Sequence, residues 1–360
     1  MSKRIGILTA GGDCPGLNAV IRSVAKSAFE LGWEVIGFED GFQGVVENRF
    51  RKLKNPDVSN ILTQGGTILG TSNIANPFRY PIRQGKKLVF RDYSEKAITF
   101  LHKLDLKALI CVGGDGTLSI AEKFSRKGIP IVGIPKTIDN DLSGTDFTFG
   151  FHTAVHIATE AIDRLHTTAA SHHRVMILEV MGRYAGWIAL FSGTAGGADV
   201  ILIPEIPYHL NVICSYVGER AKHGKRFSIV VVGEGAKPKG GKMVVERMVK
   251  ASNDPIRLGG IGHVLARQIE WQSRIETRVS VLGHIQRGGS PTPEDRNLAT
   301  LFGKKAVELI QKGRIGYMAA IQSGKISSVP IRAAIRKRKS VPRNHPLLLA
   351  ARAVGTSFGD

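Results

Sequence analysis

Three short runs of β-branched and other aliphatic residues are each followed directly by a turn rich in glycine or aspartate. The runs are Ile5–Thr9, Ala108–Val112 and Ile131–Ile134, and the turns read GGDCPG, GGDGT and PKTIDND. Apolar residues at helical spacing follow the first turn over about Leu17–Leu31, and a helix is expected after the second turn to about Lys127. A strand, a tight turn and a helix in this order form the unit of a parallel α/β sheet.

The second half of the chain continues in the same style. Helices are expected at Thr153–Leu165 and Gly260–Trp271. Strands are expected at Val175–Val180, Val200–Ile203, Ile229–Val232 and Arg278–Leu282. At 360 residues, of which 42% are hydrophobic, the chain can bury the cores of about two domains. We therefore predict an α/β fold of two Rossmann-like lobes with mainly parallel sheets and an active site in the cleft at the carboxyl ends of the strands.

The lobe boundaries are expected near residues 150 and 285, with a crossing back between the lobes towards the C-terminus. One lobe would contain residues 1–150 and 286–336, and the other would contain residues 151–285 and 337–360. No stretch approaches the roughly 20 consecutive apolar residues of a membrane helix, and the N-terminus MSKRIGILTAGGD is unlike a signal peptide. We therefore expect a cytoplasmic protein without a membrane partner.

The three cysteines of the chain are Cys14, Cys111 and Cys214. Their number is odd and they lack CxxC spacing, which argues against a disulfide framework and against a zinc site. We interpret them as reduced thiols.

Basic residues outnumber acidic residues by 50 to 30, which gives a formal net charge of +20 and favours anionic partners. The run Arg336–Lys339 could contact a nucleic-acid backbone. Neither a recognisable nucleic-acid module nor interleaved aromatic residues accompany it, so a solvated basic tail is the favoured interpretation and no nucleic-acid partner is expected. Binding of phosphorylated metabolites would explain part of the excess of basic residues.

The glycine-rich turns have the composition of phosphate-binding loops. Glycines after a strand let backbone N–H groups approach phosphate oxygens, and the next helix presents its positive end. Gly11 and Gly12 meet this need in the first turn, as do Gly113, Gly114 and Gly116 in the second. One such loop is more often an ordinary tight turn, whereas two in one chain indicate a phosphorylated ligand.

Asp115 lies inside the second glycine turn, where a carboxylate could hold Mg²⁺ against phosphate oxygens. Capping of the following helix, beside Thr117, is an equally weighted alternative. The turn TIDND places paired carboxylates and a hydroxyl directly after a buried strand. Phosphoryl transfer needs an acid group that orients and deprotonates the acceptor hydroxyl, and Asp139 is our candidate for this base, with Asp141 in support.

Cations that could bind a phosphorylated substrate flank two of the expected strands. They are His173, Arg174 and Arg183 around Val175–Val180, and Arg278, His284 and Arg287 around Val279–Leu282. Arginine matches phosphate oxygens bidentately, and an imidazole can donate beside it. Each arginine alone would more often be a solvated surface charge, but two of these arginines adjoin glycines at strand ends.

Five motifs in the order GGDCPGLN, GGDGT, PKTIDNDLSGTD, EVMGRYAGW and ETRVSVLGHIQRGGSP resemble the phosphofructokinase family. The resemblance spans about Lys3 to Gly316. GGDGT alone also occurs in lipid and NAD kinases, whereas TIDND, VMGR and GHIQRGGSP together are highly specific. The resemblance implies transfer of a phosphoryl group from Mg-ATP to the 1-hydroxyl of fructose 6-phosphate.

The resemblance also implies roles for individual residues. The phosphoryl donor would be bound by Gly12, Gly114, Asp115, Gly116 and Thr117, with Mg²⁺ on Asp115. Asp139 would be the general base, with Thr137 beside it, and Arg183 would stabilise the transition state. The sugar phosphate would contact Thr137, Asp139, Arg174, Met181, Gly182, Arg183, Glu234, Arg278, His284 and Arg287. The lobe that begins the chain would bind the donor, and the smaller lobe fructose 6-phosphate.

In the family, the arginines that match Arg174 and Arg278 reach the site from a neighbouring subunit. The resemblance therefore implies a homo-oligomer, usually a tetramer, with shared active sites.

The residues that bear on the phosphoryl donor are mixed. Well-studied bacterial ATP-using members carry Gly where Lys136 stands and Arg where Asn73 stands, and Lys136 is typical of pyrophosphate-using relatives. Gly116 is typical of ATP-using members, since pyrophosphate enzymes generally carry Asp there. We favour ATP, because an adenylate requires space whereas an extra cation suits either donor. The alternatives are a pyrophosphate-dependent phosphotransferase and a non-catalytic phosphosugar-binding subunit.

Overall fold

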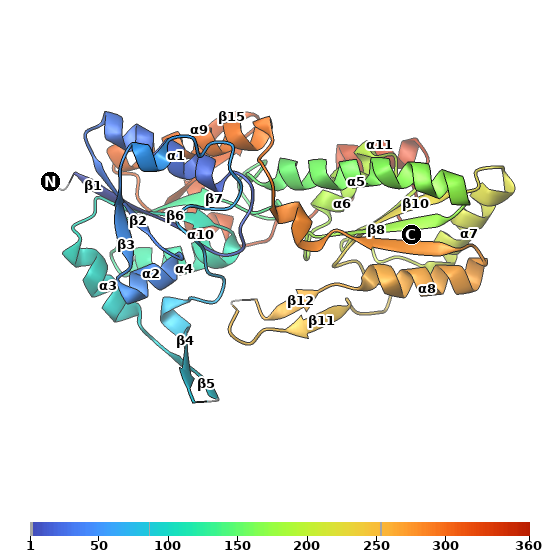
Figure 1. Cartoon of the computed structure of the whole chain (residues 1–360), viewed down its shortest axis with the longest axis horizontal. Helices are drawn as coiled ribbons and strands as arrows, with labels where there is room; N and C mark the ends of the chain where they lie inside the picture. The colour runs from blue at the N-terminus through green and yellow to red at the C-terminus, as the bar shows by residue number, and fades with distance from the viewer. Residues whose placement is uncertain (1–2, 86, 253) are drawn as a thin grey trace.

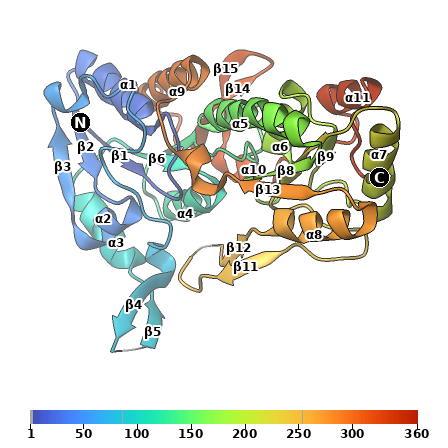
Figure 2. The same ribbon diagram turned by 45° about the vertical axis from the view of Figure 1, so that its right-hand side comes forward.

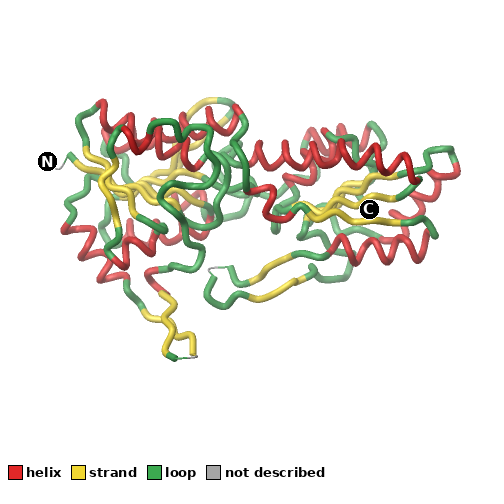
Figure 3. Tube along the Cα trace, viewed as in Figure 1, coloured by secondary structure: helices red, strands yellow, loops and turns green. Residues whose placement is uncertain are grey.

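Two sheets, each covered by helices on both faces, lie side by side along the long axis of the molecule (Figure 1). The computed structural model describes residues 3–85, 87–252 and 254–360. Figure 3 shows the same layering, with strands in the middle of each lobe and helices outside them. The predicted α/β fold with two lobes is confirmed.

The larger sheet has seven strands and is parallel except at its two edges. From one edge to the other, the strands are β15 (Lys325–Pro330), β14 (Tyr317–Gln322), β7 (Ile131–Pro135), β6 (Leu109–Gly113), β1 (Arg4–Thr9), β2 (Glu34–Phe38) and β3 (Phe50–Leu53). Only β3 and β15 pair antiparallel with their neighbours. Thr9 pairs with Val112, and Gly113 pairs with Pro135. The carboxyl ends of β1, β6 and β7 are therefore aligned, and the loops that follow them begin side by side.

Helices cover both faces of this sheet, and their buried residues belong to two different clusters of the core. One face carries α1 (Leu17–Glu30) and α9 (Pro293–Gln311), and the other carries α2 (Phe42–Glu47), α3 (Ser94–Lys103), α4 (Asp115–Arg126) and α10 (Ile331–Ala334). Helices α1 and α9 approach closely at Gly303, where a Cβ atom would lie 2.6 Å from Cβ of Ser23.

The smaller sheet has four strands, all parallel. In order, they are β13 (Thr277–Val281), β8 (Val175–Val180), β10 (Ser228–Gly233) and β9 (Val200–Leu202). One face carries α5 (Phe151–His172), α6 (Trp187–Ala195) and α11 (Pro346–Ala353), and the other carries α7 (Leu210–Lys222) and α8 (Ile261–Ser273). The core cluster beneath α5 and α6 continues beneath α1 and α9, so one apolar core runs through both lobes.

Two hairpins project from the lobes on the same side of the molecule (Figures 1 and 2). They are β4 (Tyr80–Gln84) with β5 (Lys87–Arg91), and β11 (Val245–Met248) with β12 (Ile256–Leu258). Three short 3-10 helices complete the described elements: η1 (Pro56–Val58), η2 (Pro77–Arg79) and η3 (Gly283–Arg287).

The strands and helices expected from the sequence are present, with ends that shift by one or two residues in most cases. The exception is α5, which continues to His172, seven residues beyond the predicted end at Leu165. The added turns contain Thr167, Thr168 and Ser171, which are weak helix formers. Burial of Ala169 against the core supports the helix there and overrides that local preference.

The three cysteines are free thiols in buried positions, as expected. Burial raises the pKa of Cys14 to about 12 and also raises the pKa of Cys111 and Cys214. Within the part of the chain that the structure describes, no helix combines the length and the apolar character needed to cross a bilayer.

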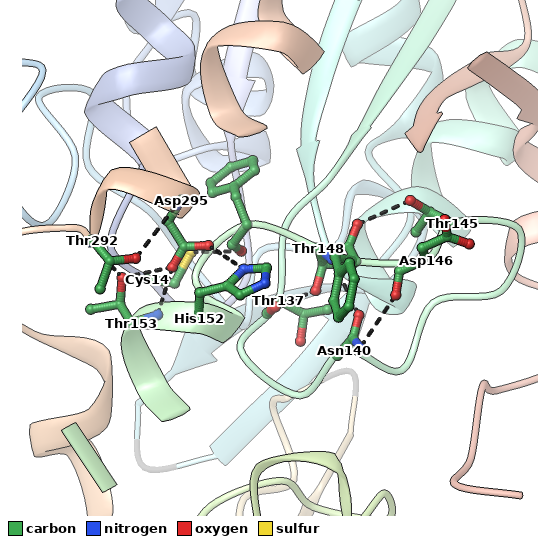
Figure 4. Close-up of polar contacts among 12 residues, drawn as sticks. Cys14, Thr137, Asn140, Thr145, Asp146, Thr148, His152, Thr153, Thr292 and Asp295 are labelled. Carbon is green, nitrogen blue, oxygen red and sulfur yellow. Dashed lines mark hydrogen bonds and ion pairs between the residues drawn. The ribbon is translucent and has the colours of Figure 1, made fainter. Parts of the chain in front are cut away.

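A buried carboxylate joins the start of α9 in the larger lobe to the start of α5 in the smaller lobe (Figure 4). Asp295 is fully buried, and its Oδ2 accepts hydrogen bonds from the backbone N–H (2.8 Å) and the hydroxyl (2.6 Å) of Thr153. Its Oδ1 lies 3.4 Å from Nδ1 of His152. The carboxylate thus accepts from one of the N–H groups at the start of α5 that have no partner within the helix.

We expect Asp295→Ala to destabilise the protein by roughly 2–3 kcal/mol, because it leaves the buried Thr153 N–H and hydroxyl without their acceptor. Glu294→Ala, at the exposed neighbouring position in the same helical turn, should cost less than about 1 kcal/mol. Urea unfolding at equal protein concentration measures both changes. If Asp295→Ala unfolds at the same urea concentration as Glu294→Ala, the hydrogen bonds between Asp295 in α9 and Thr153 in α5 do not stabilise the fold.

Candidate active site

Loops from the carboxyl ends of six parallel strands meet between the two lobes. A cavity in this region, which is called the cleft, is lined by Asp115, Asp141 and Arg338. The loops after β1, β6 and β7 come from the larger sheet, and those after β8, β10 and β13 from the smaller one. Such an arrangement is the usual ligand-binding edge of an α/β protein. It brings together the glycine-rich turns, the TIDND turn and the segment around Arg183.

The first glycine loop is contacted by two cations. Nζ of Lys136, which is buried, donates to the carbonyl oxygen of Gly12, and burial lowers the pKa of this lysine. Nη1 of Arg287, from beyond the cleft, donates to the carbonyl oxygen of Asp13 at 2.9 Å. A Cβ atom on Gly12 would lie 2.8 Å from the same Nη1, so a side chain there would displace the guanidinium of Arg287.

The second glycine loop leads directly into α4. The N-cap position is occupied by Gly114, and Asp115 is the first residue of the helix. Asp115 is therefore not the N-cap, and the capping alternative is wrong. Gly116 lies in the same first turn, and the side chain of Thr117 is buried against Gly113. The carboxylate of Asp115 remains available at the edge of the cleft.

Asp115 and Asp141 line one cavity of about 250 Å³, together with Arg338 and Lys337 from near the C-terminus. Burial raises the pKa of Asp115, and it raises the pKa of Asp141 to about 7, where the charge of Asp139 adds to the effect. The guanidinium of Arg338 acts in the opposite direction on both groups, and its Nε lies 3.4 Å from Oδ2 of Asp141.

The residues of this cavity suit a metal ion that is coordinated partly by protein carboxylates and partly by phosphate oxygens of a bound substrate. Among residues 3–85, 87–252 and 254–360, no group of three or more side chains of the metal-binding types is close enough to hold an ion. Mg²⁺ is commonly bound by one or two carboxylates plus phosphate oxygens and water. The pair Asp115 and Asp141 fits that type of site.

Asp139 lies in the loop after β7 and is only 5% exposed. Its Oδ1 is buried and has no hydrogen-bond partner among the residues that the structure describes. Its backbone N–H donates to Oγ1 of Thr137 at 3.1 Å, and Oγ1 of Thr148 donates to the carbonyl oxygen of Thr137 at 2.6 Å. The loop is thus held through hydroxyl groups while the Asp139 carboxylate stays free to accept a proton.

The segment Met181–Arg183 faces this loop from the smaller lobe. The N–H of Met181 donates to Oε1 of the buried Gln286 at 2.8 Å. Gly182 has φ +139°, and a Cβ atom there would lie 2.6 Å from the carbonyl oxygen of Ala185, so a side chain is excluded. This strained turn places the backbone of Arg183 against Glu234.

Glu234 accepts a hydrogen bond from the backbone N–H of Arg183 at 2.9 Å. Burial raises the pKa of Glu234 to about 7, and the charge of Asp139 contributes to the rise. The carboxyl groups from the two lobes therefore influence each other across the cleft. A sugar hydroxyl between them would find both a hydrogen-bond acceptor and a base.

The guanidinium of Arg183 is held by the hairpin segment of the smaller lobe. Its Nη1 lies 3.0 Å from Oδ2 of Asp254, and its Nη2 donates to the carbonyl oxygen of Ile256 at 3.4 Å. Asp254 could not be predicted from the sequence, because it lies in a segment without periodicity or a recognisable motif. In this conformation, Arg183 is paired within the protein at the edge of the cleft.

The structure divides each of the two predicted cation clusters between opposite ends of a strand. His284 and Arg287 lie in η3, after the carboxyl end of β13, and Arg287 contacts the first glycine loop. Arg174 and Arg278 lie at the amino ends of β8 and β13, where both pair with Glu276. A strand of six residues spans roughly 20 Å, so these two arginines do not belong to the cleft of their own chain.

The expectation of a solvated basic tail at Arg336–Lys339 is wrong for two of its four residues. Arg338 lies over the ring of Tyr184, with its guanidinium carbon 4.4 Å from the ring centroid, in addition to its contact with Asp141. Lys339 donates hydrogen bonds into the loop that carries Asp139. The sequence offered no signal for these contacts, because they join segments about 150 to 200 residues apart.

Comparisons with known proteins identify relatives of this chain. The family profile described as Phosphofructokinase matches residues 4–310. The ATP-dependent 6-phosphofructokinase 2 of Clostridium perfringens is 54% identical over 361 residues, which cover 99% of each chain.

Two solved structures are also similar to this chain. The phosphofructokinase of Saccharomyces cerevisiae has a TM-score of 0.80 and 30% identity over 93% of this chain, which spans only 45% of the yeast chain. A pyrophosphate-dependent phosphofructokinase from Nitrosospira multiformis has a TM-score of 0.82 at 21% identity, covering 100% of this chain and 93% of that one, which supports the fold alone. On the sequence match over most of its length, the chain belongs to the phosphofructokinase family.

Proposed function

We propose that this chain is an ATP-dependent 6-phosphofructokinase, which transfers the terminal phosphoryl group of Mg-ATP to the 1-hydroxyl of fructose 6-phosphate. The products are fructose 1,6-bisphosphate and ADP. The observation that carries the proposal is the buried, unpartnered Oδ1 of Asp139, which lies in the cleft between two glycine loops and the Arg183–Glu234 pair. The relative from Clostridium perfringens carries the same activity in its name.

In this proposal the two lobes divide the substrates. The part formed by residues 1–150 and 286–336 binds the donor, through Gly12 and through the second glycine loop with Gly114, Gly116 and Thr117. The part formed by residues 151–285 and 337–360 binds fructose 6-phosphate. The arrangement is supported by the loops after β1 and β6, whose backbone N–H groups and helix N-terminus suit phosphate oxygens.

Mg²⁺ would be held by Asp115, with Asp141 lining the same cavity. When bound, the ion supplies positive charge that offsets the charge of the donor phosphates during transfer. Burial disfavours the ionised form of both carboxyl groups and raises their pKa. A bound cation would offset this effect, which agrees with a metal site.

Asp139 would accept the proton of the 1-hydroxyl as that oxygen attacks phosphorus. Thr137 supports the Asp139 backbone and would lie beside the same substrate hydroxyl. Arg183 would leave Asp254 and stabilise the negative charge of the transferred group in the transition state. Little covalent chemistry is required of the protein, so this positioning and charge compensation account for most of the catalysis.

Asp139→Asn keeps the size of the side chain but removes the proton acceptor, and we expect kcat with Mg-ATP and fructose 6-phosphate to fall by roughly 10²–10⁴. The KM for fructose 6-phosphate should change much less. A coupled assay for fructose 1,6-bisphosphate on wild type and variant measures both constants. A variant that retains most of its turnover would show that another group is the base.

The sugar phosphate would be bound by groups from both lobes. Glu234, Met181 and Gly182 would contact the sugar, and His284 and Arg287 would bind its 6-phosphate. The guanidinium of Arg287 now donates to the carbonyl oxygen of Asp13 and is therefore close enough to the cleft to turn towards an anionic ligand.

In this proposal the 6-phosphate site of one chain lacks Arg174 and Arg278, which lie at the far ends of their strands. We infer that they complete the 6-phosphate site of a neighbouring subunit in a homo-oligomer, as the family resemblance implies, with a tetramer as the expected state. Strand β13 lies at the edge of the smaller sheet. The apolar side chains of Val281 at its end, Ile285 in η3 and Trp271 in α8 are exposed, which supports a subunit interface along this strand.

Shared sites predict complementation between two inactive variants. Arg174→Ala chains keep Asp139, and Asp139→Asn chains keep Arg174, so hybrid oligomers contain some sites with both groups intact. Mixing the two after reversible subunit dissociation should restore turnover above that of either parent treated alone. Absence of recovery in oligomers shown to be hybrid would argue against sharing, and a fully active monomer would exclude it.

The donor is the part of the proposal for which a second candidate exists. Pyrophosphate is favoured by Lys136, whose ammonium lies against the first glycine loop. ATP is favoured by Gly116, where an aspartate would set a carboxylate against the donor. A non-catalytic phosphosugar-binding subunit is disfavoured, because Asp115, Asp139 and Arg183 are all retained around one cleft.

Gly116→Asp should lower kcat/KM for ATP by at least about 100-fold, or about 2.7 kcal/mol, because the side chain would occupy the space of the α-phosphate and ribose and repel its charge. The preference for pyrophosphate relative to ATP should rise. Steady-state kinetics with both donors on folded wild type and variant tests this. If the variant uses ATP as well as wild type does, Gly116 does not select the donor.

A further inference from the structure

The segment before the C-terminal helix runs antiparallel to the loop that follows Asp139. Leu142 and Arg338 form an isolated antiparallel bridge, and the hydroxyl of Ser143 donates to the carbonyl oxygen of Lys337 at 2.6 Å. The backbone N–H of Lys339 donates to the carbonyl oxygen of Asp141 at 2.8 Å. This segment therefore reaches the residue two positions beyond Asp139.

The side chain of Lys339 enters the same loop. Its Nζ donates to Oδ1 of Asn140 at 2.9 Å and to the carbonyl oxygens of Thr145 at 3.0 Å and Asp146 at 2.7 Å. An ammonium group has three N–H donors, so these acceptors satisfy it fully. Burial lowers the pKa of Lys339 to about 8, against the opposing effect of Asp141 and Asp146.

Asn140 connects this ammonium to the candidate base. It adjoins Asp139, is buried, and has φ +51°, a conformation that a non-glycine residue adopts only with local support. Its Oδ1 also accepts from the backbone N–H of Thr148 at 3.2 Å, and its Nδ2 donates to the carbonyl oxygen of Asp146 at 3.4 Å (Figure 4). Lys339 therefore completes a set of contacts centred on the Asn140 side chain.

Asp139 depends on this support more than an ordinary buried carboxylate would. Its Oδ1 has no hydrogen-bond partner in the described part of the chain, so no direct contact at that oxygen fixes its direction. The direction must follow from the backbone, which is held on one side by Thr137 and on the other by Asn140. An error of about 1 Å in such a group can cost on the order of 10²-fold in rate.

Lys339 is itself fixed from the smaller lobe. The indole N–H of Trp187, at the start of α6, donates to the carbonyl oxygen of Lys339 at 2.9 Å. The ammonium lies 5.4 Å from the centroid of the same ring, within the range of a cation–π contact. The backbone of Lys339 is thus held in place, so its ammonium can stabilise the loop that carries Asp139 and Asn140.

We propose that Lys339 is a positioning residue for phosphoryl transfer: its ammonium holds Asn140 and the 145–146 backbone, and thereby aims the Asp139 carboxylate at the acceptor hydroxyl. This inference rests on the proposed function and on Asp139 as the base. It assigns a role in the active site to a residue of the basic C-terminal run.

The test is Lys339→Met, which keeps an unbranched side chain of similar length but removes the ammonium. We expect kcat to fall at least about 10-fold, with KM for fructose 6-phosphate and for ATP within roughly 3-fold of wild type. Arg336→Met, at an exposed position in the same segment, is the matched control and should keep both constants. Should the methionine variant fail to fold, Lys339→Gln, which keeps an N–H donor, must show the same pattern to a smaller extent.

A second measurement separates positioning from a general structural role. In the Asp139→Asn background the base is already absent, so adding Lys339→Met should lower the residual kcat by less than about 2-fold. A loss in that background as large as in wild type, an unchanged kcat, or a rise in KM alone would each overturn the inference. A wild-type protein without turnover would overturn the proposed function and this inference with it, whereas an unaffected Lys339→Met variant would overturn only the role of Lys339.

Discussion

The burial of an Asp139 carboxylate oxygen without a hydrogen-bond partner is the constraint on which the site depends. A buried polar group in this state is costly, so the rest of the loop must be stable enough to hold it. The hydroxyls of Thr137 and Thr148 support the loop on one side, and Asn140 with Lys339 supports it on the other. Order in the backbone thus replaces direct contacts to the acid, which leaves that oxygen free for substrate.

Four cations of the cleft are treated in the opposite way, because each of these four is paired inside the protein. Lys136 and Arg287 donate to carbonyl oxygens of the first glycine loop, Arg183 pairs with Asp254, and Arg338 lies beside Asp141. Phosphate oxygens are stronger partners for arginine than a backbone carbonyl is. A phosphorylated substrate can therefore take over the guanidinium of Arg287. Burial raises the pKa of Asp141 and Glu234, and their ionised forms would be stabilised by a bound Mg²⁺ and by the guanidinium of Arg183, respectively.

Much of this arrangement could be predicted from the sequence, because local patterns encode it. The strand–turn–helix units gave the fold, and the motifs around Gly12, Asp115 and Asp139 lie at strand ends that a parallel sheet brings together. Contacts between distant segments could not be predicted: Lys339 was expected in a solvated tail, and Asp254 was missed. The cation clusters were also misleading, since residues at the two ends of one strand are close in sequence but roughly 20 Å apart in space.

The central claim, that this cleft transfers a phosphoryl group from ATP to fructose 6-phosphate, is tested most directly by phosphorus NMR of one reaction. The purified protein is supplied with Mg²⁺, fructose 6-phosphate and equimolar ATP and pyrophosphate, and the phosphorus signals are followed with time. We predict that the ATP signals are replaced by ADP and a new phosphate ester on C1 of the sugar, in equal amounts, while pyrophosphate is largely retained. Loss of pyrophosphate ahead of ATP, or ATP consumption without the new ester, would contradict the account.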